Sequence, residues 1–210
     1  MVKLSDKQIT WIILMLLVLF ALLAFFISAD LVSRFDAKFY NEVAEKMSPA
    51  LTWLMLKVTH LGDVWTVAVL AGIPLLFKYS RNRLALPLMA GVFTSTLVNL
   101  LLKDLFARER PDILRMINET TYSFPSGHAM VNTTFYLLLA YFAYKQLRLL
   151  KLRSILIGLC LLAILSISIS RVYLGVHYIS DILGGILFGA AIAMLFVRLF
   201  KKQLNEGSIQ

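Results

Sequence analysis

Six long apolar runs set the strongest limit on how this sequence can fold. They lie near 9–28, 62–77, 84–106, 127–144, 153–170 and 178–199. A helix that crosses a bilayer needs about 20 mostly apolar residues, so the runs predict an all-α polytopic membrane protein with six transmembrane helices in one domain, residues 1–210. A hydrophobic fraction of 60% excludes an ordinary soluble domain of this length. The first run is longer than the roughly 7 to 15 apolar residues of a secretion signal, and we expect it to be a retained span.

The stretch around the second run departs from a simple span. Between Pro49 and Phe77 there are 29 residues, more than one span requires, and His60, Gly62 and Asp63 interrupt them. We therefore expect a short surface or re-entrant helix before the span. Further upstream, every fourth residue is apolar among charged neighbours: Phe35, Phe39, Val43 and Met47. This spacing predicts an amphipathic helix that lies at the extracytoplasmic interface or packs on the other helices as a lid.

Basic residues concentrate at the two termini and in the 78–83 and 145–153 connections. These four segments hold 12 of the 21 Lys and Arg residues but only two of the 12 acidic residues, whereas the opposite side holds nine basic and ten acidic residues. By the positive-inside rule we expect both termini in the cytoplasm and the 103–126 and 171–177 loops on the outer face of the cell membrane. The formal charge of +9 follows from this distribution, so we expect no nucleic-acid partner.

A cluster of charged residues marks the outer end of the third apolar run. From Lys103 to Pro111 its sequence is Lys-Asp-Leu-Phe-Ala-Arg-Glu-Arg-Pro. Lys103 and Arg110 are candidate ligands for an anionic group. Taken alone, however, the cluster is better explained by basic side chains that reach toward lipid headgroups from a helix end.

A Pro-Ser-Gly-His sequence, Pro125 to His128, opens the fourth apolar run. Proline and serine are common at helix starts, so capping alone explains Pro125 and Ser126. Gly127 lets a ligand approach the backbone closely, and the free N–H groups at a helix start favour an anion. His128 beside such a site can donate a proton to a departing oxygen.

The third block places a histidine and a carboxylate at the start of the sixth run. Ser170 and Arg171 end the fifth run, and His177 and Asp181 follow. A spacing of four residues puts His177 and Asp181 on one helical face, with Cβ atoms about 5–6 Å apart. The carboxylate can then hold one ring nitrogen and leave the other as a nucleophile. Such a pair is often purely structural, but a structural pair needs neither Arg171 nor a second outward histidine nearby.

The three blocks together supply the parts of a phosphoryl-transfer site. Three cations on three segments are available for phosphoryl oxygens: Lys103, Arg110 and Arg171. We expect His177 to act as nucleophile, His128 as general acid and Asp181 as the group that orients His177. Charge on a transferring phosphoryl group spreads over its equatorial oxygens, so clustered cations stabilise the transition state.

The same residues match a known signature in order and spacing. Lys103-x6-Arg110-Pro111, Pro125-Ser126-Gly127-His128 and Ser170-Arg171-x5-His177-x3-Asp181 resemble the three-part signature of the type 2 phosphatidic acid phosphatase superfamily, and all eleven specified residues agree. The resemblance implies a six-span phosphatase that requires no metal or other cofactor. It implies that His177 attacks phosphorus to give a phosphohistidine and that His128 protonates the leaving group. The residues that it implies for binding the phosphoryl oxygens are Lys103, Arg110, Ser126, Gly127 and Arg171.

The resemblance leaves the substrate open among lipid phosphates. Bacterial enzymes of this compact, outward-facing kind act on undecaprenyl pyrophosphate, phosphatidylglycerol phosphate or phosphatidate, in cell-wall or phospholipid metabolism. We expect the partner to be a lipid phosphate within the membrane, and we expect no obligate protein partner. The headgroup is expected to enter laterally from the outer leaflet, with the 30–60 segment forming part of the entry wall.

Two functions of other classes stay open at this point. A transporter or non-catalytic binding protein for lipid phosphates or anions also uses cations at a membrane edge, but it gives the histidines no task. A metal-dependent hydrolase is compatible with two histidines and an aspartate, but three adjacent cations would repel a divalent ion. Activity that persists in a chelator distinguishes the phosphohistidine enzyme from the metal-dependent one.

Overall fold

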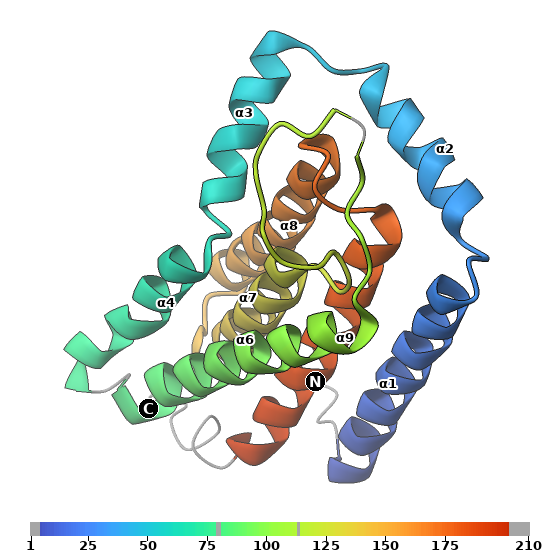
Figure 1. The fold of residues 1–210 in the computed structure, drawn as a ribbon. Helices are drawn as coiled ribbons and strands as arrows, with labels where there is room; N and C mark the ends of the chain where they lie inside the picture. Colours follow the sequence, from blue (N-terminus) through green and yellow to red (C-terminus); the bar gives the residue numbers. More distant parts are fainter. Residues whose placement is uncertain (1–4, 79–80, 113, 202–210) are drawn as a thin grey trace.

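The computed structural model describes residues 5–78, 81–112 and 114–201, and among these residues it contains helices but no strand. In chain order the α-helices are α1 (Asp6–Ser28), α2 (Ser33–Ala44), α3 (Pro49–His60), α4 (Val64–Gly72), α6 (Leu86–Phe106), α7 (Gly127–Gln146), α8 (Leu150–Tyr173) and α9 (Ile179–Leu199), as labelled in Figure 1. A 3-10 helix, η1 (Ile73–Leu76), and a π-helix, η2 (Arg81–Ala85), lie between α4 and α6. Three of the charged residues on which the predicted membrane orientation depends lie outside the described residues: Lys3, Lys202 and Glu206.

Four helical segments are long and apolar enough to cross a membrane: α1, Arg83–Phe106, α8 and α9. A fifth crossing is available if α3 and the segment Val64–Leu76, which are bent by 48° relative to each other, form one broken span. The bend falls between His60 and Val64, where the sequence predicts an interruption, and α3 is a separate helix before α4. The predicted all-α membrane class is therefore confirmed. α7 is not among the segments that qualify as spans by length and composition.

α7 lies at the centre of the bundle, with α6, α8 and α9 packed around it (Figure 1). Its polar residues Asn132, Thr133 and Thr134 are buried, and the Thr134 hydroxyl donates to the Gly189 carbonyl of α9 at 3.0 Å. A helix surrounded by other helices faces little lipid, and polar side chains can hydrogen-bond across such contacts. This central position explains why the α7 sequence does not need to be uniformly apolar.

Two glycines allow α9 to pack closely on α7. A Cβ atom at Gly185 would lie 2.7 Å from the carbonyl oxygen of Ser126, and one at Gly189 would lie 2.4 Å from the carbonyl oxygen of Met130. Both obstructing atoms belong to the backbone, which cannot rotate away as a side chain can. The start of α9 is thereby fixed against the start of α7, and both starts carry candidate site residues.

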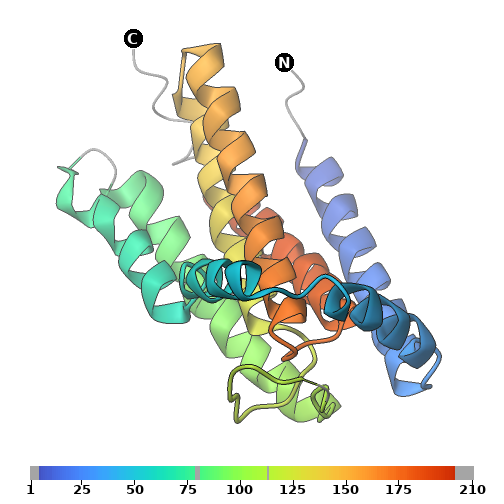
Figure 2. The same cartoon turned by 90° about the horizontal axis from the view of Figure 1, so that it is seen from above.

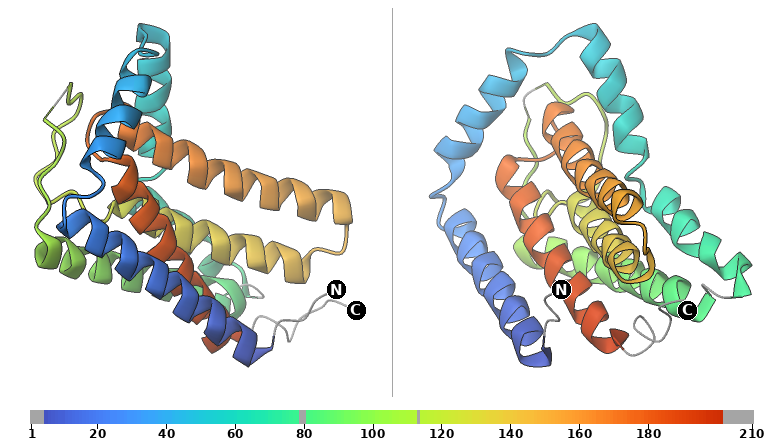
Figure 3. Two further views of the ribbon diagram at one scale, coloured as in Figure 1. Left: turned by 90° about the vertical axis from the view of Figure 1, so that its right-hand side faces the viewer. Right: turned by 180° about the vertical axis from the view of Figure 1, so that it is seen from behind.

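The predicted amphipathic helix is α2, which with α3 runs across the axes of the bundle helices (Figures 2 and 3). Phe39 and Val43 of α2, and Met47 just after it, pack on buried side chains of α7, α8, α9 and the turn between α8 and α9. Phe35 is exposed. Of the two roles expected for this helix, lying at the membrane interface or packing on the other helices as a lid, the packing favours the lid.

The three sequence blocks gather at one end of the bundle. The 107–126 loop, the 174–178 turn and the α2–α3 pair lie together there, whereas the first turn of α1 and the last turn of α9 lie at the other end (Figure 3, left). Helices of similar length therefore bring segments that are distant in sequence to a common face.

Candidate active site

His177 lies in the turn between α8 and α9 and is 2% exposed. Its Nδ1 is 3.4 Å from Oδ2 of Asp181, and the Ser123 hydroxyl oxygen is 3.3 Å from the same nitrogen. The Ser123 hydroxyl donates to Asp181 Oδ2 at 2.5 Å. The other ring nitrogen, Nε2, is 3.3 Å from Nη1 of Arg110. The structure thus brings the i, i+4 pair together, with Nδ1 on the carboxylate side and Nε2 on the cation side.

Burial and neighbouring charge keep His177 neutral. Burial, followed by the positive charges of Arg110, Arg171 and Lys103, holds the pKa of the His177 imidazole well below its ordinary value. A neutral imidazole carries a hydrogen on one nitrogen and a lone pair on the other. With the Nδ1 hydrogen directed at Asp181, the lone pair lies on Nε2.

The three predicted cations approach His177 from three elements. Lys103 extends from α6, Arg110 from the 107–126 loop and Arg171 from the end of α8. Lys103 and Arg171 are only 5% and 2% exposed, so water screens their charges weakly. Hydrogen bonds to oxygen atoms help to hold the three side chains in place. Lys103 donates to the Tyr122 carbonyl, Arg110 donates to the Val176 carbonyl, and Arg171 donates to the Thr59 hydroxyl.

The Pro-Ser-Gly-His sequence forms the start of α7. Ser126 is the N-cap residue, and its hydroxyl accepts a backbone N–H of the first turn at 3.4 Å. A Cβ atom at Gly127 would lie 2.9 Å from Oδ1 of Asn99, so glycine allows the close approach of α6. His128 Nε2 lies 3.1 Å from Oδ1 of Asp63, at the bend between α3 and α4.

These side chains surround a cavity of about 170 Å³. Six of the eight candidate residues line it: Lys103, Arg110, Gly127, His128, Arg171 and His177. The other two, Ser126 and Asp181, lie behind this lining and are joined by a 3.1 Å hydrogen bond from the Ser126 N–H to the Asp181 carbonyl. The arrangement offers three cations for an anionic group and a neutral imidazole beside them.

Comparison with known proteins gives the family. The sequence model of the PAP2 superfamily matches residues 84–205, which include all eight candidate residues. The chain belongs to the PAP2 superfamily. Phosphatidylglycerophosphatase B of Bacillus subtilis is 34% identical to it over 187 residues, which cover 86% of this chain and 90% of that protein. The undecaprenyl-diphosphatase of Sulfolobus acidocaldarius is 25% identical over 199 residues, which cover 92% of each chain.

A solved PAP2 structure has the same fold. The crystal structure of a transmembrane PAP2 type phosphatidylglycerolphosphate phosphatase from Bacillus subtilis matches with a TM-score of 0.82 and 28% identity, covering 94% of this chain and 98% of that chain. The family and these relatives confirm the resemblance drawn from the motifs. They also confirm the predicted enzyme class, a membrane lipid phosphatase.

Glu119 is a residue of this PAP2 site that the sequence did not reveal. It lines the cavity, forms an ion pair with Arg171 and has its other oxygen 3.9 Å from Arg110. Burial acts to raise the pKa of the Glu119 carboxyl, but the charge and hydrogen bond of Arg171 and the charge of Arg110 outweigh it, so this pKa lies below its ordinary value. No motif marks the residue, because only the folded loop brings it to the end of α8.

Arg108 is a second unexpected residue. Its guanidinium donates to Asp181 Oδ1 at 2.5 Å and to Asp36 Oδ2 at 2.8 Å, and both carboxylates are buried. One oxygen of Asp181 is therefore paired with a cation, while the other faces His177 and Ser123. Arg108 belongs to the 103–111 cluster, whose simplest interpretation from sequence was contact with lipid headgroups. Only the folded structure shows that Arg108 pairs with buried carboxylates instead.

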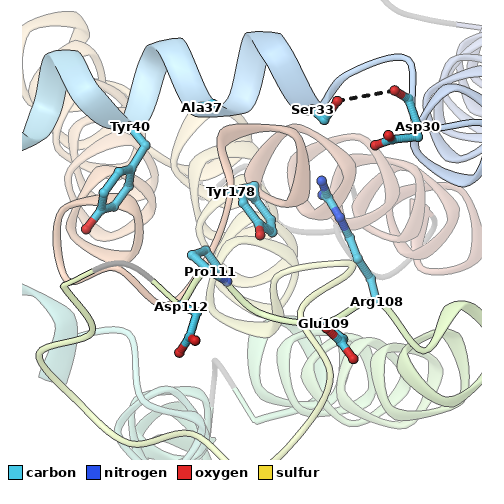
Figure 4. Close-up of a pocket in the computed structure, with 9 residues that line it drawn as sticks. All are labelled: Asp30, Ser33, Ala37, Tyr40, Arg108, Glu109, Pro111, Asp112 and Tyr178. Atoms are coloured by element: carbon cyan, nitrogen blue, oxygen red, sulfur yellow. Dashed lines mark hydrogen bonds between the residues drawn. The ribbon is translucent and has the colours of Figure 1, made fainter.

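A larger cavity, of about 370 Å³, lies between α2 and the 108–112 segment (Figure 4). None of the eight candidate residues lines it. Its charged residues are Asp30, Glu109, Asp112 and Arg108, and the Arg108 guanidinium lies 4.3 Å from the ring centre of Tyr178. This larger cavity has three carboxylates and only one guanidinium, a balance of charge that disfavours binding of a phosphate group. The candidate active site is therefore the smaller cavity that contains the histidines.

An apolar groove of about 260 Å³ lies between α4 and α6. The residues that line it are Val64, Ala68, Ala71, Met89, Val92, Phe93 and Thr96. Val64 and Thr96 also line the histidine-containing cavity, so the polar cavity and the apolar groove share a boundary. A molecule with a phosphate at one end and an apolar chain at the other matches this combination.

Proposed function

We propose that this PAP2 protein hydrolyses a phosphomonoester or pyrophosphate on a membrane lipid through a phosphohistidine on His177. The observation that carries the proposal is the setting of His177, with Nδ1 beside Asp181 and Nε2 beside Arg110 in a cavity lined by cations. A lone pair held at that position is pre-oriented for attack on a phosphoryl group bound by the cations.

In the first step, the nucleophilic nitrogen forms a bond to phosphorus while the bond from phosphorus to the lipid oxygen breaks. His128 transfers a proton to that oxygen, so the lipid leaves as an alcohol or, from a pyrophosphate, as a monophosphate. Asp181 stabilises the positive imidazole that forms. Lys103, Arg110 and Arg171 offset the charge on the equatorial oxygens, each by on the order of 4 kcal/mol at 4 Å and an effective dielectric constant of about 20.

In the second step, water attacks the phosphohistidine. His128, now neutral, takes a proton from the water as the new oxygen–phosphorus bond forms and the nitrogen–phosphorus bond breaks. Inorganic phosphate leaves and His177 returns to its neutral form. The proton that His128 gave in the first step is thus recovered in the second, and the cycle closes.

The lipid chain is assigned to the α4–α6 groove, because the groove continues from the phosphate cavity. Lateral entry from the outer leaflet then passes between these two helices. No residue of the 30–60 segment lines the groove, so the proposed route does not use this segment as the entry wall expected from the sequence. It contributes instead the Thr59 contact to Arg171 and the α2 lid.

The substrate range is proposed to include more than one lipid phosphate. The two relatives carry names that refer to phosphatidylglycerophosphate and to undecaprenyl diphosphate. Each of these molecules has a terminal phosphoryl group on a long apolar chain, the features that the cavity and the groove address. Phosphatidate shares both features and belongs to the same proposed range.

The proposed topology has six spans, both termini in the cytoplasm and the active site at the outer face of the cell membrane. The Val64–Leu76 segment, which follows the bend after α3, and the central α7 supply the crossings beyond the four apolar segments. The basic 145–153 connection joins α7 to α8 at the end of the bundle away from the histidines (Figure 3, left). Its charge supports a cytoplasmic position for that end.

Phosphate release by the purified protein in detergent, with a chelator present, tests the proposal. The substrates are undecaprenyl pyrophosphate, phosphatidylglycerol phosphate and phosphatidate. We expect release by the wild type and losses of about 10⁴-fold or more for His177→Ala and Asp181→Asn. Release by His177→Ala at the wild-type rate would overturn the nucleophile. Loss of wild-type activity in the chelator would favour the metal-dependent hydrolase, and binding without release from any substrate would favour the non-catalytic function.

A further inference from the structure

The corner between α3 and α4 presses against the active-site helices. A Cβ atom at Gly62 would lie 2.4 Å from Cγ2 of Ile167 and 3.1 Å from Cδ2 of His128. The Gly62 carbonyl also accepts a hydrogen bond from Nδ2 of Asn132 at 2.9 Å. The corner is thus held on α7 and α8 at the level of His128, and glycine is the residue that permits this distance.

Asp63 follows Gly62 and occupies the N-cap position of α4 in an extended backbone conformation. An aspartate at this position ordinarily accepts a backbone N–H of the first helical turn, but the Asp63 side chain makes no such bond. Its two oxygens are directed at histidines instead. Oδ1 lies 3.1 Å from Nε2 of His128, and Oδ2 lies 3.0 Å from Nδ1 of His60.

The two histidines that contact Asp63 differ in how far their side chains are exposed to solvent. The His60 side chain is 70% exposed and the Asp63 side chain 41% exposed, and pairs of this kind add little to fold stability. The His128 side chain is 16% exposed and lines the phosphate cavity. The contact between Asp63 and His128 therefore connects the corner to a group that faces the substrate.

We propose that Asp63 is a positioning residue for His128, the counterpart of Asp181 for His177. The inference deepens the proposed function and rests on the assignment of His128 as general acid. Asp63 accepts the Nε2 hydrogen of His128, which fixes the ring orientation and leaves Nδ1 to face the leaving group. His60 holds the second oxygen of the carboxylate and so limits its rotation.

The proton balance follows from this geometry. In the first step the Nδ1 hydrogen of His128 moves to the lipid oxygen as the phosphorus–oxygen bond breaks, and the electron pair of that bond stays on the oxygen. In the second step Nδ1 takes a proton from the attacking water. Nε2 keeps its hydrogen throughout, and the Asp63 carboxylate stabilises the positive imidazole that exists before the first step and after the second.

The dependence of the rate on the leaving group tests the role of Asp63. The comparison uses phosphatidate, whose leaving oxygen is alkyl, and a nitrophenyl phosphate with an alkyl tail, whose phenolate leaves without proton donation. We expect Asp63→Asn to lower kcat on phosphatidate by about 10- to 100-fold with little change in KM. On the nitrophenyl ester we expect less than about a threefold loss in kcat/KM, which reports only the first step, because acid catalysis contributes little there. No loss in kcat/KM, or an equal loss in kcat/KM on both substrates, would overturn the proposal.

A double-mutant comparison on phosphatidate alone gives an independent test. If Asp63 acts through His128, Asp63→Asn in a His128→Ala background causes no further loss, and a multiplied loss would contradict the role. His60→Gln should cause a smaller loss than Asp63→Asn. Glu42→Gln, which removes an exposed carboxylate of α2, is the matched control and should retain the wild-type rate. Size-exclusion and thermal unfolding profiles in detergent show whether each variant is folded.

The outcome for His177 separates this inference from the proposed function. If His177→Ala is inactive and Asp63→Asn loses activity equally on both substrates, only the positioning role of Asp63 fails. If His177→Ala keeps the wild-type rate, the phosphohistidine mechanism fails whatever Asp63→Asn does.

Discussion

At the scale of single residues, the two active-site histidines have opposite tasks and different partners. The proposed nucleophile, His177, must keep a lone pair, and its partner Asp181 is fully buried and paired with Arg108. The proposed acid, His128, must carry a proton, and its partner Asp63 is partly exposed to water. A carboxylate whose charge is already offset orients an imidazole without drawing a proton onto it. The surroundings of each aspartate thus agree with the task of its histidine.

The pH dependence of the reaction is predicted from the charges around His177. Only neutral His177 attacks, so activity falls as the pH drops through its pKa, which burial and the charges of Arg110, Arg171 and Lys103 hold well below the ordinary value. Removing one of these charges in Arg110→Gln must raise that pKa. We therefore expect the acid limb of the kcat/KM profile to move to higher pH in Arg110→Gln, along with a lower maximum.

The kcat/KM profiles of the wild type and Arg110→Gln are measured with the same substrate, so ionisation of the substrate phosphate contributes equally to both profiles. Glu109→Gln changes the charge of an exposed neighbour in the same loop and serves as the control. An acid limb that stays in place, or moves to lower pH, in Arg110→Gln would show that the loop cation does not act on His177.

At the scale of helices, the site depends on how closely α9 packs on α7. Gly185 and Gly189 remove the side chains that would keep these helices apart, and Thr134 bonds across the contact to the Gly189 carbonyl. His177 lies just before α9, Asp181 lies in the first turn of α9, and His128 lies at the start of α7. The distance between the two helices therefore sets the distance between the proposed acid and the proposed nucleophile.

Substitution of Gly189 tests this packing. In Gly189→Ala the added Cβ would lie 2.4 Å from a backbone oxygen of α7, so the helices must separate. We expect the free energy of unfolding to fall by about 1–3 kcal/mol, seen as a lower Tm in detergent. Gly158→Ala on α8 is the control, because a Cβ there has no atom within 4 Å, and we expect it to leave the Tm unchanged or to raise it slightly. Equal Tm values for the two variants would contradict the packing argument.

At the scale of the whole molecule, the class of fold and the motif residues were accessible from sequence. The apolar runs near 84–106 and 178–199 predict helices within a few residues of α6 and α9, since length and apolar composition alone specify such segments. The Pro-Ser-Gly-His start of α7 was also correctly placed, because helix caps are local signals. The motifs selected the six residues that line the cavity, although their order in the chain gives no distance.

The contacts that complete the site were not accessible from sequence, because they join segments far apart in the chain. Glu119 reaches Arg171 and Asp63 reaches His128 only after the loops and the α3–α4 corner are folded. No periodic pattern or cap signal encodes such a pairing. The proposed α4–α6 route for the lipid chain was not foreseen for the same reason: an apolar groove between two helices depends on their packing, whereas the amphipathic pattern of 33–44 is visible along the chain.

The groove between α4 and α6 predicts a selective effect on long-chain substrates. Ala68→Phe places a ring in the groove, and exclusion of about two CH₂ groups of the lipid, at about 0.8 kcal/mol each, corresponds to a loss of about tenfold in kcat/KM. A short-chain phosphate that does not reach the groove should be hydrolysed at the wild-type rate. Leu162→Phe, at an exposed apolar position of α8, is the control. Equal effects of Ala68→Phe on short and long chains would exclude the groove as the chain site.

Trapping of the phosphoenzyme tests the central claim most directly. The wild type is mixed with a ³²P-labelled lipid phosphate, stopped within a turnover in alkaline denaturant, and digested. We predict an acid-labile, base-stable label on the peptide that contains His177, and no label in His177→Ala. His128→Ala slows both steps but leaves the labelled position unchanged. A wild-type enzyme that turns over without acquiring label, or a label that persists in His177→Ala, would contradict the phosphohistidine mechanism.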